Sequence, residues 1–148
     1  MIDVRTAAKY LIQRYEQESG SSMDEMKLHK LLYFTQRESF VLLGKPMFLD
    51  KFEAWKYGPV MRCIRKAHWE YHAQSVLPAD SEYIPVLEDT LRRYARMDSW
   101  TLSNISHGET CWQKAKDKEI SSYPEEIETS DIEYDAKVIK YRRFMCPK

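Results

Sequence analysis

Glycine and cysteine are scarce in this sequence. Only four of the 148 residues are glycine, which is too few for the glycine-rich loops that hold nucleotide phosphates. The three cysteines, Cys63, Cys111 and Cys146, are scattered and odd in number, so a secreted disulfide scaffold is excluded and a reducing cytoplasm is favoured. No C-x-x-C pair occurs. The sequence therefore predicts no nucleotide site and no cofactor.

Net charge and long apolar runs are also missing. Lysine plus arginine and aspartate plus glutamate number 23 each, so no overall field draws the protein to nucleic acid or to an anionic membrane. No stretch approaches the roughly 20 apolar residues of a membrane span. The N-terminus lacks the cationic start and apolar run of a signal peptide. We expect a cytoplasmic protein with no membrane contact, whose partners are recognised by local shape.

What the sequence does contain is an ordinary core and many large rings. At 43% hydrophobic and 31% charged residues, the chain is expected to form one domain that buries roughly two-thirds of its unfolded surface. Four tryptophans and ten tyrosines exceed what a minimal core needs. Some of these rings are therefore available for a contact surface.

The longest apolar segment, Ser22 to Leu43, predicts a central helix. Ser22 and Glu25 have the S-x-x-E spacing of a capping box, and apolar residues occupy most of the helical circumference, as in a helix buried on all sides. Gly44 favours the left-handed conformation that ends a helix, and the proline two residues later prevents its continuation.

The flanking periodicities predict a mainly α fold, a compact single-domain bundle of about six or seven helices around this central helix. One helix is expected over residues 3–18 and a third from about Val60, with Ile64, Ala67 and Tyr71 on one face. Further helices are expected after a cap at Ser81 and over residues 99–106, 110–118 and 130–145. We divide the single domain 1–148 into a core (3–118), an acidic connector (119–129) and the C-terminal helix (130–145).

A short β-hairpin is predicted near Met47 to Tyr57. The side chains alternate in character from Phe52 to Tyr57, which is typical of a strand. Met47–Leu49 is the expected partner strand, with the two residues between them as the turn. Gly58 permits a sharp backbone turn, and Pro59 presets the φ angle of a first helical residue, so the third helix is expected to follow at once.

Three blocks of the chain resemble the signatures of a known family. The blocks are Leu28 to Gln36 (LHKLLYFTQ), Glu53 to Val60 (EAWKYGPV), and Leu102 to His107 (LSNISH) followed by Trp112 and Ala115. Their order and spacing are similar to those of the Panacea domain, also called the SocA-type antitoxin-associated or GepA-like phage-associated domain. Two positions depart from the pattern, because Ser106 stands where Thr is usual and Cys111 where Pro is common.

The resemblance implies a helical bacterial or phage protein that acts as the antitoxin of a toxin–antitoxin system and neutralises a cognate protein toxin by direct binding. Family members are paired with toxins of unrelated fold, and one subgroup acts as a proteolytic adaptor that delivers its toxin to a protease. A phage-associated regulatory protein is a further alternative. The partner-binding or family-motif candidates are Lys30, Tyr33, Gln36, Glu53, Trp55, Tyr57, Gly58, Pro59, His107 and Trp112.

Several of these residues also have a purely structural interpretation. Gln36 is expected to be a core amide bonded to a neighbouring backbone group, because buried polar groups are paired. Glu53 needs a partner, which Lys30, His107 or Arg62 could supply, and a structural ion pair is favoured over a catalytic carboxylate. His107 is expected to bond the last carbonyls of its helix.

Three other classes of function have little support in the sequence. A small hydrolase using Glu53 and His107 is disfavoured, because no G-x-S-x-G elbow accompanies them and no enzyme activity is expected. His68 and His72 are spaced i, i+4 near Cys63, but a third ligand and the intervening glutamate are missing, so no metal site is expected. Nucleic-acid binding is disfavoured by the neutral overall charge. The local basic patches are Arg62, Arg65, Lys66, Lys137, Lys140, Arg142 and Arg143. Nothing in the sequence indicates an oligomeric state.

Overall fold

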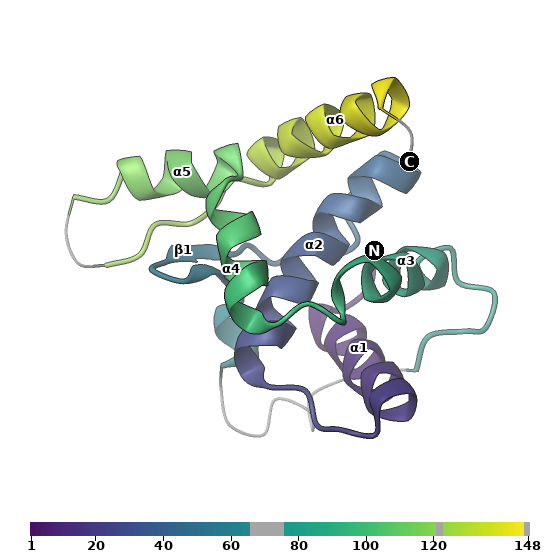
Figure 1. The fold of residues 1–148 in the computed structure, drawn as a ribbon. Coiled ribbons are helices and arrows are strands. Elements are labelled where there is room, and N and C mark those ends of the chain that lie inside the picture. Colours follow the sequence, from purple (N-terminus) through teal and green to yellow (C-terminus); the bar gives the residue numbers. More distant parts are fainter. Residues whose placement is uncertain (66–75, 121–122, 147–148) are drawn as a thin grey trace.

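The structure, a computed structural model, describes residues 1–65, 76–120 and 123–146. These residues form six α-helices, one short 3₁₀ helix and one two-stranded antiparallel hairpin (Figure 1). The elements are α1 (Val4–Ser19), α2 (Glu25–Leu43), β1 (Glu53–Trp55), β2 (Gly58–Val60), η1 (Arg62–Ile64), α3 (Ile84–Tyr94), α4 (Ser99–His107), α5 (Thr110–Asp117) and α6 (Thr129–Met145). The predicted mainly helical bundle with a small hairpin is confirmed.

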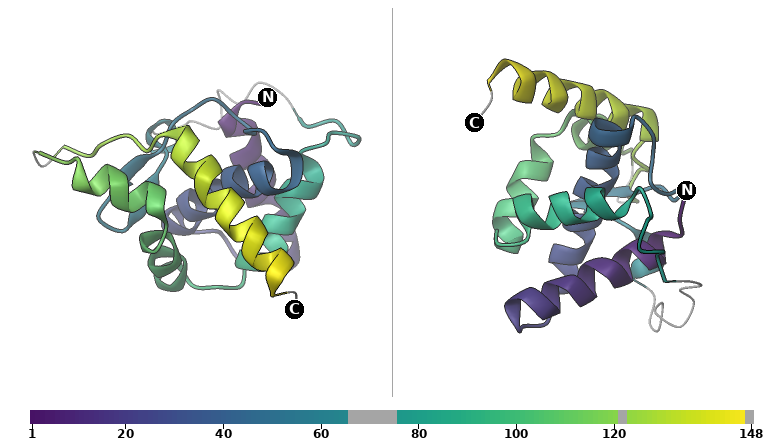
Figure 2. Two further views of the ribbon diagram at one scale, coloured as in Figure 1. Left: turned by 90° about the horizontal axis from the view of Figure 1, so that it is seen from above. Right: turned by 90° about the vertical axis from the view of Figure 1, so that its right-hand side faces the viewer.

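Helix α2 is the central element, as its apolar circumference predicts. It is buried continuously from Lys27 to Val41 and contacts α1, α3, α4, α6 and β2. Figure 1 shows α1 and α3 on one side of α2 and the hairpin on the other, and Figure 2 shows α6 crossing over the C-terminal half of α2. Every other part of the fold is therefore positioned by this one helix.

The ends of α2 are set by Asp24 and Gly44. The Asp24 side chain accepts a hydrogen bond of 2.8 Å from the backbone N–H of Lys27, so Asp24 is the N-cap and the capping box predicted at Ser22 is wrong. Aspartate caps as well as serine does and lies directly before the helix. At the other end, Gly44 has φ 72° and donates to the Phe40 carbonyl, which confirms the predicted stop.

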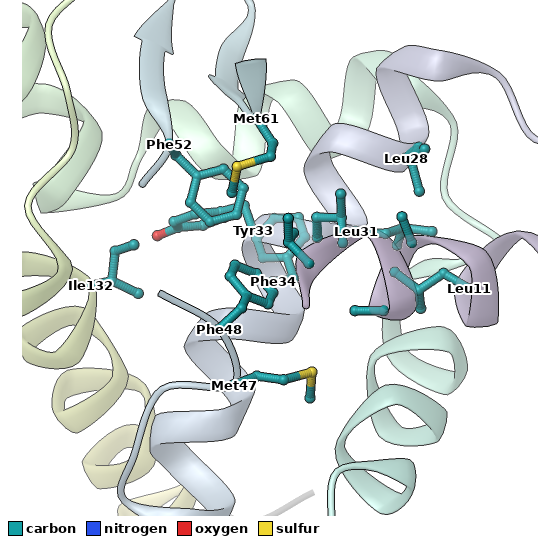
Figure 3. Packing of buried hydrophobic residues seen from close by; sticks show 14 of the residues in the cluster. Leu11, Leu28, Leu31, Tyr33, Phe34, Met47, Phe48, Phe52, Met61 and Ile132 are labelled. Atoms are coloured by element: carbon teal, nitrogen blue, oxygen red, sulfur yellow. The ribbon is translucent and has the colours of Figure 1, made fainter. Parts of the chain in front are cut away.

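The hydrophobic core gathers side chains from α1, α2, α6 and the segment around the hairpin. Figure 3 shows Leu11 against Leu28 and Leu31 of α2, and the rings of Phe34, Phe48 and Phe52 close to Tyr33, with Ile132 reaching in from α6. The ring of Tyr33 makes edge contacts with those of Phe34 and Phe52, at centroid distances of 5.3 and 5.8 Å. Part of the aromatic content of the sequence thus lies in the core around α2.

The hairpin pairs differently from the sequence expectation. Strand β1 pairs with β2, with Glu53 opposite Val60 and Trp55 opposite Gly58, so the predicted pairing with Met47–Leu49 is wrong. The N–H of Met47 is instead bound by the side-chain oxygen of Gln36, at 2.8 Å. The backbone of this segment therefore belongs to the core of α2 and is not available as a strand.

The third helix does not begin after Pro59. Residues 58–60 form strand β2, and between β2 and residue 65 the chain forms a single 3₁₀ turn, η1. Pro59 has no N–H to donate, and it is tolerated in β2 because it lies in a short strand of a two-stranded sheet. The rest of the predicted helix, including Ala67 and Tyr71, lies outside the described residues.

The acidic connector lies along the free edge of β1. The N–H of Ala54 donates to the Glu125 carbonyl at 2.8 Å, and the N–H of Ile127 donates to the Phe52 carbonyl at 2.7 Å. The Ile127 side chain is completely buried. The connector therefore extends the hairpin by one short antiparallel bridge and leads into α6.

Helix α6 is fixed to α2 by a buried ion pair. The Arg143 guanidinium donates two hydrogen bonds, of 2.8 and 2.5 Å, to the two carboxylate oxygens of Glu38, whose side chain is fully buried. Arg143, predicted only as part of a basic patch, is thus a structural residue. Helices α3 and α6 begin at Ile84 and Thr129, close to the predicted caps. No helix in the described part of the chain is long and apolar enough to cross a membrane.

Candidate functional site

The three sequence blocks converge on the hairpin. Lys30 of α2 runs beneath it, and its ammonium donates to the Pro59 carbonyl at 3.2 Å. Gly58 has φ 114°, and a Cβ there would lie 2.8 Å from Cε of Lys30 and 2.5 Å from Oγ of Ser106. Only glycine fits this position, because the backbone conformation and the two neighbouring side chains both exclude a larger residue.

His29 ties α2 to the end of β2. Its Nδ1 accepts a hydrogen bond of 3.1 Å from the backbone N–H of Met61, and its Nε2 lies 3.2 Å from a carboxylate oxygen of Glu25. Nδ1 is therefore the acceptor nitrogen and Nε2 carries the proton. Burial lowers the pKa of His29 from 6.5 to about 4, against the opposing effect of Glu25, so the ring is neutral at pH 7.

Helices α4 and α5 hold the hairpin from the opposite side. The Ser103 hydroxyl donates to the Tyr57 carbonyl at 2.6 Å, and the Trp112 indole N–H donates to the Trp55 carbonyl at 3.0 Å. The backbone on both sides of the turn is thus bound by side chains from separate helices. This arrangement fixes the direction in which the side chains of the turn point.

His107 lies at the end of α4, as predicted, but its ring has a different role. It stacks on the Trp112 ring with 4.3 Å between centroids. Its Nε2 has no hydrogen-bond partner in the part of the chain that the structure describes. No bond from the imidazole to the last carbonyls of α4 is present among the hydrogen bonds of these residues, so that expectation is wrong.

Glu53 is paired with Arg62, one of its three expected partners. The Arg62 guanidinium donates to both carboxylate oxygens, at 2.9 and 3.0 Å, and the Trp55 indole donates at 2.9 Å. A carboxylate with three donors is a structural acceptor and not a free general base. Neither Glu53 nor His107 lines the two cavities described below, so the geometry gives the hydrolase alternative no support.

Tyr33 and Gln36 belong to the core. Gln36 is the predicted core amide, since its nitrogen donates to the Phe48 carbonyl at 2.9 Å. The Tyr33 hydroxyl lies 3.1 Å from the sulfur of Cys111, and burial raises the pKa of this tyrosine. Both side chains are closed off from solvent, so their motif positions are explained by folding.

Cys111 departs from the family pattern in a way that the structure explains. Its backbone N–H donates to the Asp135 carboxylate of α6 at 2.8 Å. Proline, which is common at this position in the family pattern, has no N–H and could not make this bond. The departure therefore exchanges a rigid residue for a hydrogen bond between α5 and α6.

Three neighbouring aromatic side chains of the hairpin and α4 form what we call the aromatic surface: Trp55, Tyr57 and Trp100. Tyr57 is 42% exposed and Trp100 is 59% exposed, and their rings meet edge to face at 5.3 Å between centroids. Trp55 is half-buried beneath the guanidinium of Arg65, 4.8 Å from the ring centre. Sequence reasoning missed Trp100, although its place on the face of α4 opposite Leu102 was a usable signal.

Two cavities open on the described surface. A cavity of about 260 Å³ adjoins the aromatic surface and is lined by Glu25, Met26, His29, Lys30, Trp55, Lys56, Tyr57, Val60 and Arg65. A larger one of about 600 Å³ lies among α1, α2 and α3. The larger cavity contains none of the motif candidates.

No metal centre is built by the described residues, in which no group of three His, Cys, Asp or Glu side chains is placed to hold an ion. His68 and His72, the two weak metal candidates, lie outside the described residues. Cys63 is half-buried, and burial raises the pKa of its thiol.

Comparison with known proteins agrees with the three converging blocks. Residues 28–113 match the sequence profile of the family described as "Antitoxin SocA-like, Panacea domain". The chain is also 27% identical over 128 residues to Antitoxin SocA of Caulobacter vibrioides (strain NA1000 / CB15N), covering 72% of this chain and 65% of that protein. The chain thus spans less than two-thirds of that relative's length. No solved structure matches the present chain. The matched residues contain the hairpin and the side chains that bind its backbone, and on this evidence the chain belongs to the SocA-like antitoxin family, whose defining unit is the Panacea domain.

Proposed function

We propose that this protein is an antitoxin that acts in the cytoplasm and neutralises a cognate protein toxin by direct binding through the aromatic surface. The observation that carries the proposal is the exposed, paired arrangement of Tyr57, in the turn of the hairpin, and Trp100, on α4. Large exposed aromatic side chains are the typical anchors of protein interfaces. Membership of the family supplies the expected class of partner.

Preorganisation supports this surface over the other exposed rings. The carbonyls of Trp55 and Tyr57 are each bound by a side chain of a neighbouring helix, so the hairpin loses little conformational freedom on binding. The exposed rings of α6, such as Tyr141 and Phe144, lie on a helix whose last turns are largely exposed and are attached to α2 through Arg143. The hairpin is therefore the better platform for a specific contact.

A toxin gene adjacent to that of this protein would supply the partner for the test. Co-expression with that toxin should restore growth, and Tyr57→Ala or Trp100→Ala should weaken the toxin affinity by about 30-fold each, since interface anchors contribute about 2 kcal/mol or more. Tyr141→Ala, at a 65% exposed ring on α6, is the matched control and should leave rescue unchanged. Both Tyr57→Ala and Trp100→Ala should melt at the wild-type temperature.

Two outcomes would contradict the proposal. Full rescue by the Tyr57→Ala/Trp100→Ala double variant would show that the aromatic surface is not part of the toxin interface. The toxin level is also followed by immunoblot. A sharp fall of that level when the protein is present would show that the toxin is delivered to a protease and not blocked by binding alone. Trp112→Ala is a control for folding, because it frees the Trp55 carbonyl and should lower the melting temperature whether or not the toxin binds.

A further inference from the structure

The cavity of about 260 Å³ beside the aromatic surface, which we call the cationic cavity, has an unusual charge distribution. Its walls contain three cationic side chains, Lys30, Lys56 and Arg65, and a single carboxylate, Glu25. The carboxylate is already engaged with the Nε2 of His29. Because His29 is neutral at pH 7, the cavity carries uncompensated positive charge.

Lys30 is the most buried of these three cationic residues. Its side chain is only 2% exposed, and its ammonium bonds one carbonyl, that of Pro59. No carboxylate of the described residues lies within ion-pair distance of it. An ammonium has three N–H donors, and buried lysines are almost always paired with an anion. Burial accordingly lowers the pKa of Lys30 to about 8, with a small opposing effect of Asp24.

The remaining walls are suited to the stem of a side chain. The rings of Trp55 and Tyr57 and the side chains of Met26 and Val60 present apolar surface, and the backbone that carries the two rings is held by hydrogen bonds to its carbonyls. The volume lies below the roughly 300–1,000 Å³ of small-molecule sites. It is therefore better matched to one amino-acid side chain than to a whole metabolite.

We propose that the cationic cavity receives the carboxylate of one aspartate or glutamate side chain of the toxin, which pairs with Lys30 while its stem packs against Trp55 and Tyr57. This inference rests on the proposed function and adds to it the chemistry of recognition. The aromatic surface then supplies contact area, and the carboxylate supplies orientation, as charge complementarity does at other interfaces. Arg65 and Lys56 stand at the exposed rim, where they favour the approach of an anion.

A first experiment needs no toxin, so it is independent of the proposed function. N-acetyl-glutamate N-methylamide is titrated into the isolated protein, with N-acetyl-glutamine N-methylamide as the uncharged control. The glutamate compound should shift the Lys30 ¹³Cε and Trp55 indole signals in a saturable manner, and it should raise the pKa of Lys30 towards its ordinary value. In the Lys30→Met variant the saturable shift of the Trp55 indole signal should be lost. Equal shifts with the two compounds, or no saturable shift, would overturn the inference.

A second experiment uses the complex. Lys30→Met should weaken toxin binding at least tenfold, whereas Lys140→Met, which removes an exposed cation of α6, should have no effect. Combined with single Asp→Asn and Glu→Gln variants of the toxin, Lys30→Met should lose its effect against one of them, because the two changes then remove one contact. Additive losses with every toxin variant would overturn the inference, and failure of wild-type binding would overturn the proposed function instead.

A substitution at the exposed rim of the cationic cavity tests binding without disturbing the fold. Arg65 is exposed, so Arg65→Gln should leave the melting temperature unchanged. It should slow association with the toxin, and this slowing should disappear at high salt because rim charges act mainly on encounter. An unchanged association rate at low salt would contradict the proposed approach of an anion.

Discussion

The buried imidazole of His29 predicts how stability depends on pH. The ring is 1% exposed and accepts a hydrogen bond from Met61 through Nδ1. Its folded-state pKa is about 4, below its ordinary 6.5, so the folded state favours the neutral form. The stabilising contribution is complete above pH 6.5 and is lost as the pH falls towards 4. A difference of one in pKa corresponds to about 1.4 kcal/mol, so the total loss is about 3 kcal/mol.

His29→Asn separates this effect from the other titrating groups. The asparagine oxygen can accept the same hydrogen bond from Met61 but does not titrate, while Glu25, Lys30 and Arg65, which face the imidazole, remain in both proteins. The free energy of unfolding is measured with urea from pH 7 to pH 4. Wild type should be the more stable protein at pH 7, and the difference should shrink by about 3 kcal/mol at pH 4. Parallel curves for the two proteins would refute the reasoning.

Two further substitutions probe the hairpin and α6. Gly58→Ala should lower the free energy of unfolding by more than the roughly 1–3 kcal/mol of backbone strain, because its Cβ meets Lys30. Gly20→Ala is the control, since Gly20 also has a positive φ but no atom lies within 4 Å of its Cβ position, and it should cost less. Equal urea midpoints for the two variants would contradict the contact with Lys30. Arg143→Met should cost about 3 kcal/mol because it removes both hydrogen bonds to the buried Glu38 carboxylate and leaves it only the more distant Arg37, at 3.8 Å. Adding Glu38→Gln should restore much of that loss in the same assay; a double variant no more stable than Arg143→Met would contradict the pairing.

Helices were predictable where local signals decide them. The stop of α2 at Gly44 depends on a backbone conformation that glycine adopts readily, and this prediction is confirmed. The prediction of the N-cap of α2 was wrong because two suitable capping residues, Ser22 and Asp24, lie within three positions. In the structure it is Asp24 that accepts the hydrogen bond from the Lys27 N–H. Propensity ranks both residues as good caps, so only the folded geometry separates them.

The hairpin register was not predictable, because it is decided by distant residues. Alternation identifies a strand but not its partner, and Gln36 removes the backbone of Met47 from competition through a contact that no local pattern shows. The role of Gly58 has the same origin, since the side chain that excludes a Cβ comes from Lys30, in another element.

Motif membership and accessibility are separate properties of the site residues. The resemblance marked Tyr33 and Gln36 together with Trp55 and Tyr57, yet the first two lie inside the core and the others at the surface. Trp100 belongs to none of the quoted blocks and lies against Tyr57. Sequence blocks therefore located the hairpin, while its outward face had to be found from the packing of α4.

The bridge between the acidic connector and β1 limits how another chain can join this sheet. One edge of the hairpin is taken by Glu125 and Ile127, and the carbonyls of Tyr57 and Pro59 are already bound by side chains of α4 and α2. An incoming peptide finds no vacant row of main-chain donors and acceptors, so it cannot be captured as an added strand. A partner that binds the hairpin is therefore selected through side chains alone, and single substitutions can change these while the main-chain hydrogen bonds of the hairpin stay in place.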